Sequence, residues 1–387
     1  MTAGEFVVVG LGAMGSATAF QLARRGRDVL AIDQYSPPHI YGSSHGETRI
    51  TRCAIGEAPH YSPLALRSHE IWREIEAETG SSLLTTTGGL ILSSSSRTAR
   101  LHVDDFFANT LAAARRFGIA HELLDTQEIR RRFPQFRVRD GEQAYFEPGA
   151  GFLRPEACIA AQLQLATRFG AQIREHERVL RFEPLADGVL VHTGSDTIRT
   201  GKLILCAGPW LPQLLGPRYG APFRILRQVL FWFAIGDFAA WSAEHCPVYI
   251  WELQGPDQAI YGFPAIDGPP GGIKIATQQY EKTTTPDAVE RDVPPAEIAA
   301  MHRLIAPFFA GLTHDCLKAV TCLYTQTPDS GFVICPHPDS DRILIASPCS
   351  GHGFKHSAAI GELLADMATG TAPHIDISPF SLSRFLQ

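Results

Sequence analysis

The segment 5–34 constrains the fold of this chain more than any other stretch of its sequence. Residues 6–9 are a short, apolar and β-branched run, which is typical of a buried strand. Three glycines with the spacing Gly-x-Gly-x-x-Gly follow it: Gly10, Gly12 and Gly15. In this motif the first glycine allows a tight turn, the second lets the backbone approach a pyrophosphate, and the third lets a helix pack close to the strand.

The residues after the motif complete a βαβ unit. Residues 13–25 predict a helix, whose positive N-terminal end would face the phosphates of a nucleotide. Residues 29–32 predict a second strand that ends at Asp33, 23 positions after Gly10 (33 − 10). A carboxylate about 20 positions after the first glycine commonly binds a ribose hydroxyl. The unit predicts a dinucleotide site, with NAD and FAD both possible, and the alternative is an ordinary βα turn with chance glycines.

Composition excludes several classes of protein. The net charge of −6 over 387 residues gives no reason to expect binding to nucleic acid or to an anionic membrane. No apolar run reaches the roughly 18 residues of a membrane span. The first strand begins too early to leave room for a signal peptide, and the eight cysteines show no metal-binding spacing. We therefore expect a reduced, cytoplasmic protein without a metal site.

The rest of the chain predicts two kinds of sheet. Strands and helices alternate through residues 151–206, as in a doubly wound sheet, and Val179 begins one of these strands. Residues 207–210 then form a second glycine-containing turn next to the cofactor crevice. Residues 224–277 instead predict successive strands without a helix between them, which favours an antiparallel second domain. Its aromatic residues are more typical of core packing than of a substrate pocket.

The loop after Asp33 is rich in proline, glycine and hydroxyl side chains. Three of its residues carry hydrogen-bonding side chains: Ser43, Ser44 and His45. Arg49 and Arg52 add two cations that would share one face of a helical turn and clamp an anion. The alternatives are a solvated basic surface, or an Arg52 that pairs with an acid such as Glu47 or Glu57 and braces the loop.

A second anion-facing motif lies near the C-terminus. Residues 342–347 predict a strand and residues 357–367 a helix, joined by a turn that contains Gly351, Gly353 and Lys355. This arrangement of strand, glycine turn and helix also directs backbone N–H groups and a cation at an anion.

Two further residues are unusual for their surroundings. Lys274 lies within the apolar strand run Gly-Ile-Lys-Ile-Ala, where a cation is unfavourable unless it is paired or used. The alternative is a lysine on the solvated face of the sheet. Cys322 lies in the stretch 321–329, which precedes the C-terminal motif, and spacing alone favours a small buried hydrophobic residue.

Five motifs, in chain order, resemble the monomeric sarcosine oxidase and N-methyltryptophan oxidase family. They are the GLGAMG unit with Asp33, GSSHGETRITR, CAGPW, TCLYTQTPD and SGHGFK. The resemblance runs from the first strand to Arg384, and it implies FAD rather than NAD. Cys322 stands where this family attaches the flavin 8α carbon through a thioether, and Arg49 and His45 stand at positions lining the flavin.

The resemblance also implies roles in catalysis. Arg52 and Lys355 match positions that bind the substrate carboxylate, Lys274 matches a lysine that activates oxygen, and Tyr261 matches an active-site tyrosine. We expect a monomer that oxidises a secondary amino acid, N-methylated or cyclic, by hydride transfer to flavin N5, with O2 reduced to H2O2 and an imine as product. The alternatives are a flavin dehydrogenase or D-amino-acid-type oxidase, an NAD(P)-dependent dehydrogenase, and a non-catalytic dinucleotide-binding partner.

The implied fold class is α/β, with an α+β second domain. We expect a Rossmann-like FAD-binding domain made of residues 1–85, 150–220 and 325–387, and a discontinuous antiparallel-sheet substrate domain made of 86–149 and 221–324. The residues expected to contact FAD are Gly10, Gly12, Gly15, Asp33, Ser43, Ser44, His45, Arg49, Val179, Cys322, Gly351, Gly353 and Lys355.

The chain departs from the family pattern around the expected substrate pocket. Gln278 stands where histidine is frequent, and Pro348 and Cys349 stand where a glycine and a large apolar residue are usual. Two extra residues lie between Tyr261 and Lys274. These changes bear on the identity of the substrate and leave the type of chemistry unaffected.

Overall fold

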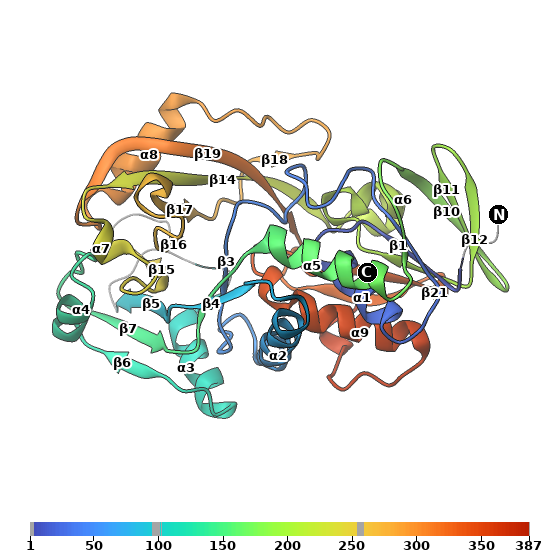
Figure 1. The fold of residues 1–387 in the computed structure, drawn as a ribbon, viewed down its shortest axis with the longest axis horizontal. Helices are drawn as coiled ribbons and strands as arrows, with labels where there is room; N and C mark the ends of the chain where they lie inside the picture. Colours follow the sequence, from blue (N-terminus) through green and yellow to red (C-terminus); the bar gives the residue numbers. More distant parts are fainter. Residues whose placement is uncertain (1–3, 95–100, 102, 254–258, 387) are drawn as a thin grey trace.

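Two large sheets organise the computed structural model (Figure 1). The structure describes residues 4–94, 101, 103–253 and 259–386. The parts of the predicted domains at 1–3, 95–100, 102, 254–258 and 387 lie outside the described residues.

The first sheet is the predicted Rossmann-like sheet. Its strands are, in spatial order, β20 (Val333–His337), β21 (Ser340–Ser347), β13 (Lys202–Leu205), β1 (Phe6–Val9), β2 (Val29–Ile32) and β9 (Gln172–Arg174). The pairs from β21 to β9 are parallel, and β20 is an antiparallel edge strand. An α/β fold with a parallel nucleotide-binding sheet is thereby confirmed.

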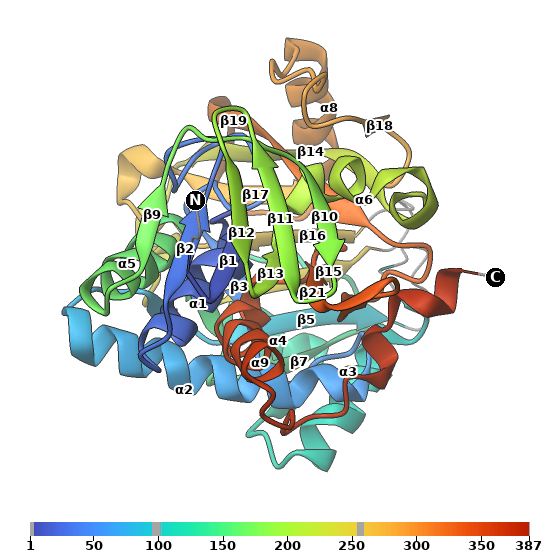
Figure 2. The ribbon, with the colours of Figure 1, turned by 90° about the vertical axis from the view of Figure 1, so that its right-hand side faces the viewer.

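Alternate residues of β1 enter two different cores. Phe6 and Val8 pack with the helices, whereas Val7 and Val9 pack with the opposite layer, because successive strand side chains point to opposite faces. The helices of the first core are α1 (Ala13–Ala23), α2 (Ser62–Thr79), α5 (Pro155–Arg168) and α9 (Ser357–Thr369). The opposite layer, seen in Figure 2, contains β10 (Val179–Leu185), β11 (Gly188–Thr193), β12 (Thr197–Thr200) and α6 (Leu211–Gly220).

The second sheet is mainly antiparallel. Its main path runs β18 (Thr283–Thr284), β14 (Arg224–Ile235), β17 (Ile273–Thr277), β16 (Ala259–Phe263), β15 (Val248–Glu252), β5 (Gly89–Ser94), β7 (Glu142–Glu147) and β6 (Glu122–Leu124). β19 (Leu312–Gln326) pairs with β14 along most of its length (Figure 1). β5 and β15 are parallel, which is possible because no hairpin joins them.

A buried aromatic core lies beneath the second sheet. Its aromatic members include Phe231, Phe233, Tyr249 and Trp251, so their interpretation as core residues is confirmed. The helices around this sheet are α3 (Phe106–Arg116), α4 (Thr126–Arg132), α7 (Phe238–Trp241) and α8 (Pro295–Ile305). The short α7 lies between β14 and β15, where no helix was expected.

A small three-stranded sheet places the arginine-containing loop. It consists of β3 (Arg49–Thr51), β8 (Gly151–Leu153) and β4 (Leu84–Thr86), with β8 antiparallel to both neighbours. The condition under which Arg49 and Arg52 would share a face, a helical turn, is therefore not met, because Arg49 lies in a strand. Residues three apart on an extended chain point to opposite sides, so the two guanidinium groups belong to different sites.

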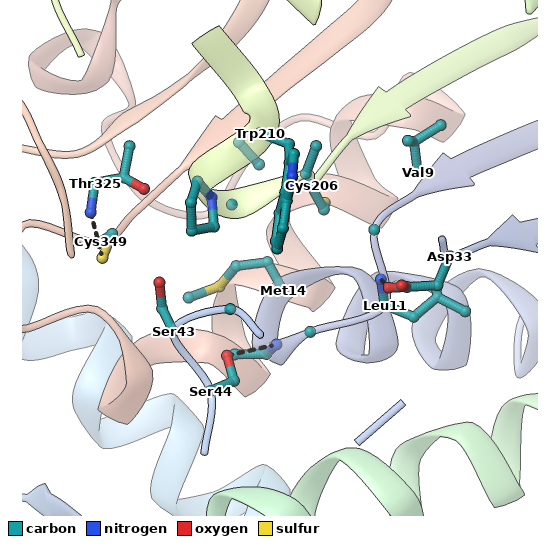
Figure 3. Close-up of a pocket in the computed structure, with 18 of the residues that line it drawn as sticks. Val9, Leu11, Met14, Asp33, Ser43, Ser44, Cys206, Trp210, Thr325 and Cys349 are labelled. Carbon is teal, nitrogen blue, oxygen red and sulfur yellow. Dashed lines mark hydrogen bonds between the residues drawn. The ribbon is translucent and has the colours of Figure 1, made fainter. Parts of the chain in front are cut away.

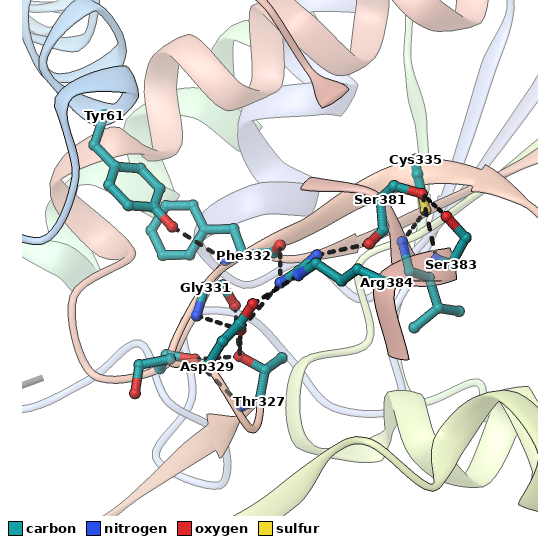
Figure 4. Close-up of polar contacts among 12 residues, drawn as sticks. Tyr61, Thr327, Asp329, Gly331, Phe332, Cys335, Ser381, Ser383 and Arg384 are labelled. Atoms are coloured by element: carbon teal, nitrogen blue, oxygen red, sulfur yellow. Dashed lines mark hydrogen bonds and ion pairs between the residues drawn. The ribbon is translucent and has the colours of Figure 1, made fainter. Parts of the chain in front are cut away.

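The turn between β19 and β20 shows what the end of the TCLYTQTPD motif does (Figure 4). The carboxylate of Asp329 accepts hydrogen bonds from the N–H of Gly331 at 2.9 Å and from Arg384 at 2.7 Å, while Thr327 Oγ1 donates to the carbonyl of Gly331 at 2.7 Å. These contacts fix the entry to β20 and attach the C-terminal segment. The division into two domains stays a proposal.

Candidate active site

A cavity of about 310 Å³ opens beside the glycine motif. Nine of the predicted cofactor residues line it: Gly10, Gly12, Asp33, Ser43, Ser44, Arg49, Val179, Gly351 and Gly353. Figure 3 shows Thr325 and Cys349 toward one end and Val9 and Asp33 toward the other. The CAGPW turn, singled out in the sequence as a close-approach turn, also lines the cavity.

The glycine motif packs as its spacing predicts. Gly10 has φ of +86°, a left-handed conformation that favours glycine. A Cβ on Gly15 would lie 1.7 Å from the carbonyl oxygen of Gly10, so α1 packs against the end of β1 only with glycine there. A Cβ on Gly12 would meet only Ser44 Oγ, at 3.4 Å, so this glycine leaves the backbone open toward the cavity.

Asp33 holds the same turn. Its Oδ2 accepts the N–H of Leu11 at 2.7 Å, and its Oδ1 accepts the N–H of Tyr35 at 2.9 Å. A carboxylate has about four lone-pair sites, so Asp33 keeps acceptor capacity for a ribose hydroxyl. This bracing role was not foreseen from the sequence.

The lining of the cavity fits FAD. The hydroxyl oxygens of Ser43, Thr325 and Ser347 are buried, line the cavity and have no hydrogen-bond partner among the described residues. Buried polar atoms normally form hydrogen bonds, so these three unpaired hydroxyls indicate that a polar ligand binds here. With the glycine turn for a pyrophosphate and Asp33 for a ribose, they match the groups of a flavin dinucleotide.

Four of the residues predicted to contact FAD do not line the cavity in the described part of the chain: Gly15, His45, Cys322 and Lys355.

Cys322 lies directly behind the cavity wall. Its Sγ is 3.7 Å from Arg49 Nη2 and 3.7 Å from the carbonyl oxygen of Ser43. Arg49 Nη2 also donates to that carbonyl at 2.8 Å. Since Arg49 and Ser43 both line the cavity, the thiol is one residue layer away from it.

Lys274 of β17 is buried and its ammonium group is fully engaged. Nζ donates to the carbonyls of Gly46 at 2.6 Å and Thr48 at 2.8 Å, and to Thr48 Oγ1 at 3.1 Å. It also lies 4.6 Å from the ring centroid of Phe263 and 5.4 Å from that of Trp232. Lys274 is only 3% exposed, so the solvated alternative is wrong. Burial lowers the pKa of Lys274 well below its ordinary value.

Two other predicted residues lie near Lys274 and the cavity. His45 is buried, and burial, with Arg49 and Lys274 nearby, lowers its pKa to about 3, so its ring is neutral. The hydroxyl of Tyr261 is 3.4 Å from that of Tyr324, which lines the cavity.

Arg52 and Lys355 converge on one carboxylate. Arg52 Nη2 lies 2.7 Å from Glu57 Oε2, and Lys355 Nζ lies 3.9 Å from Glu57 Oε1. Arg52 also donates to the carbonyl of Ala54, and Lys355 donates to that of His352 at 2.7 Å. The pairing of Arg52 with Glu57, one of the alternatives, is therefore present. Burial lowers the pKa of Lys355 to about 7, against the opposing effect of Glu57.

Two other carboxylates were missed from the sequence. Glu147 accepts the N–H of Cys53 at 2.6 Å and of Ala54 at 3.2 Å, beside Arg52. Glu156 accepts the N–H of Gly46 at 2.6 Å and of Glu47 at 3.1 Å. The available signal for Glu147 was its position directly after the apolar and aromatic residues 144–146, where a buried acid needs partners.

Comparison with known proteins identifies the class. The sequence matches the family model described as FAD dependent oxidoreductase over residues 5–367. The chain therefore belongs to the FAD-dependent oxidoreductase family, which decides the cofactor in favour of FAD.

Two relatives belong to the group of enzymes that the five motifs resemble. The chain is 43% identical to a monomeric sarcosine oxidase of Streptomyces avermitilis over 376 residues, 96% of this chain and 95% of the relative. It is 32% identical to an N-methyl-L-tryptophan oxidase of Escherichia coli over 385 residues, 98% of this chain and 99% of the relative. The resemblance inferred from the five motifs is confirmed.

Solved structures show the same fold. NikD, an unusual amino acid oxidase, superposes with a TM-score of 0.83 at 24% identity, covering 98% of each chain. L-Proline dehydrogenase from P. horikoshii superposes with a TM-score of 0.79 at 20% identity, covering 99% of this chain and 98% of the other. Separately, none of the helices in the described part of the chain has the length and apolar character needed to cross a bilayer.

Proposed function

We propose that this protein is an FAD-dependent oxidase of a secondary amino acid, N-methylated or cyclic, that yields an imine and hydrogen peroxide. The observation that carries the proposal is the convergence of Arg52 and Lys355, from opposite ends of the chain, on a single carboxylate. When bound, FAD accepts a hydride from the carbon next to the amine and passes the electrons to O2.

The substrate carboxylate would be bound by Arg52 and Lys355. Both side chains are at least nine-tenths buried, where charge-assisted hydrogen bonds to a carboxylate are strong. Glu57 now balances the two cations, and a substrate carboxylate would compete with it for them. Holding the acid group in this way would orient the substrate, and no strong general base is needed if the amine enters neutral.

Lys274 would supply the fixed positive charge that favours reduction of oxygen. A desolvated ammonium stabilises an anion that develops beside it far more than a solvated one does. Its three oxygen acceptors hold it in place and favour its charged form, against the lowering of its pKa by burial. Tyr261, with Tyr324, would line the amine side of the pocket.

Cys322 would bind the flavin covalently. The placement of its thiol behind Ser43, beside the permanent charge of Arg49, supports this proposal. The remaining predicted flavin contacts, His45 and Lys355 among them, are proposed because they match the family motifs. We also expect a cytoplasmic monomer, and all eight cysteines are free thiols in the structure.

A panel of N-methyl and cyclic amino acids, each paired with the matching amine that lacks a carboxylate, tests the proposal when assayed for peroxide. We expect turnover with stoichiometric peroxide for an amino acid of the panel. Substrate-dependent bleaching of the flavin without peroxide, with turnover only on addition of an artificial electron acceptor, would instead identify the dehydrogenase alternative. No bleaching by any secondary amino acid would contradict the proposal.

A further inference from the structure

A left-handed turn at Gly46 and Glu47 connects a carboxylate to Lys274. Gly46 has φ of +96° and Glu47, a non-glycine residue, has φ of +71°. A non-glycine residue in this region is strained and persists only where the surroundings hold it. Glu156 accepts the two N–H groups of the turn, while the carbonyl of Gly46 accepts Lys274 Nζ at 2.6 Å. The turn therefore has an anion on its N–H side and a cation on its carbonyl side.

We propose that Glu156 is a positioning residue for Lys274: it fixes the Gly46–Glu47 turn so that the turn's carbonyl and the next one hold the lysine ammonium. The inference rests on the proposed role of Lys274 toward oxygen. An alternative role for Glu156 is local, because it lies in the first turn of α5, where an acid is favourable next to the helix dipole. That role alone would not direct Oε1 at two N–H groups of a separate loop.

The charge of Glu156 also affects the pKa of Lys274. Burial lowers the pKa of Lys274, and Arg49 of β3 lowers it further, whereas Cys322 of β19, Glu156 and Glu47 raise it. Glu47 is itself paired with Lys318, so its charge is partly neutralised. Among the described residues, Glu156 forms no ion pair with a lysine, arginine or histidine side chain, so its charge is available to oppose that of Arg49.

The substitution Glu156→Gln separates charge from hydrogen bonding, because glutamine keeps one carbonyl oxygen for the turn. The chain has only five lysines, at 202, 274, 282, 318 and 355, so ε-13C lysine labelling gives five signals that single substitutions assign. In the resting holoenzyme we expect the titration midpoint of Lys274 to fall by about one pH unit. Flavin reoxidation above that midpoint should slow about 10-fold, with anaerobic reduction by substrate unchanged.

A matched control is Glu76→Gln. Glu76 likewise accepts two consecutive N–H groups, from Leu83 at 2.7 Å and Leu84 at 2.9 Å, but away from Lys274. The Glu76→Gln variant should leave the titration midpoint of Lys274 and the rate of flavin reoxidation at their wild-type values. If Glu156→Gln does not fold, Glu156→Asp, which withdraws the carboxylate by one methylene, should lower the midpoint in the same direction by less.

An unchanged Lys274 midpoint in the Glu156 variant would overturn the inference, as would equal slowing of both half-reactions. Failure of the proposed function gives a different result. If Lys274→Met left reoxidation at the wild-type rate, the role of Lys274 toward oxygen would be lost, and the NMR midpoint would still decide whether Glu156 sets the state of Lys274.

Discussion

Arg49 Nη2 lies 3.7 Å from the sulfur of Cys322, and the same nitrogen is anchored to the carbonyl of Ser43 at 2.8 Å. A permanent cation is thus fixed beside the thiol that we propose bonds to the flavin. Since Arg49 and Ser43 line the cavity, the sulfur lies directly behind the cavity wall.

The first prediction concerns this bond. Acid-precipitated protein should stay yellow, and a peptide containing Cys322 should carry the mass of FAD. Cys322→Ser should release the flavin into the supernatant. Cys349→Ser is the control, because Cys349 lines the same cavity but its sulfur accepts the N–H of Thr325 at 3.3 Å. Flavin lost from the wild type on precipitation would exclude covalent attachment and leave non-covalent FAD binding intact.

Lys274→Met removes the cation and roughly keeps the length of the side chain. Flavin reoxidation should slow by about 100- to 1,000-fold, as for loss of other single electrostatic donors, while anaerobic reduction changes far less. Stopped-flow measurement of the two half-reactions checks this. Lys318→Met is a matched control, since Lys318 also lies over the Trp232 ring, at 4.8 Å, but is 46% exposed. Equal slowing of both half-reactions would make Lys274 a structural or substrate-binding residue.

Arg52→Ala should lower kcat/KM steeply for an amino acid. Removing one partner of a desolvated charge contact typically costs about 2–5 kcal/mol, which is about 30-fold or more in kcat/KM. The matching amine without a carboxylate should lose much less, so it serves as the internal control. Equal losses for the two compounds would mean that Arg52 only braces the loop through Glu57.

Binding of simple carboxylates should depend on pH through Lys355. Burial lowers the pKa of Lys355 to about 7 from its ordinary value near 10.5, so the group is charged below about pH 7 and neutral above it. An acetate-like anion binds the charged form, so its Kd should rise about 10-fold per pH unit above that value. Titration of the flavin spectrum at several pH values measures this. Lys355→Met should bind weakly with a flat profile, and a flat wild-type profile would refute the assignment.

The lowered pKa of Lys355 also decides whether its contribution to folding stability rises or falls with pH. Lys355 is protonated in the unfolded chain up to about pH 10.5 and loses its proton in the folded chain near pH 7, so the unfolded state binds more protons between these values. The contribution of Lys355 to stability therefore rises with pH across this window.

Two glycines of the nucleotide motif should respond differently to alanine. Gly15→Ala places a Cβ 1.7 Å from the oxygen of Gly10, and such overpacking typically costs about 1–3 kcal/mol, so Tm should fall. Gly12→Ala meets only Ser44 Oγ at 3.4 Å, so Tm of the apoprotein should hold while flavin content falls. Calorimetry and the ratio of flavin to protein absorbance distinguish them. A stable Gly15→Ala protein with normal flavin content would contradict the packing argument.

Local patterns were enough to predict the nucleotide-binding unit. The strand at 6–9, its glycines and Asp33 are all contiguous in the chain, so periodicity and turn chemistry determine them. The buried state of Lys274 could be suspected in the same way, since an apolar strand run around a cation implies partners.

The arginine loop shows where such reasoning fails. Arg49 and Arg52 would share a face only on a helical turn, but β8, about a hundred positions later, pairs with residues 49–51 and makes them a strand. Glu147 and Glu156 then accept N–H groups on either side of this strand. Long-range pairing decides both features, and a single sequence gives no local signal for the partner.

The chain positions of the residues that line the cavity also determine when during synthesis it can form. One wall comes from Gly10 and Asp33 and the other from Thr325, Cys349 and Gly353, so the ribosome makes the two walls at the beginning and near the end of translation. Cys322 leaves the ribosome before β21 and the turn after it have emerged, at a time when no closed pocket surrounds it. Attachment of flavin to this cysteine would therefore be a reaction of the folded, released chain, and nascent chains would carry a bare thiol.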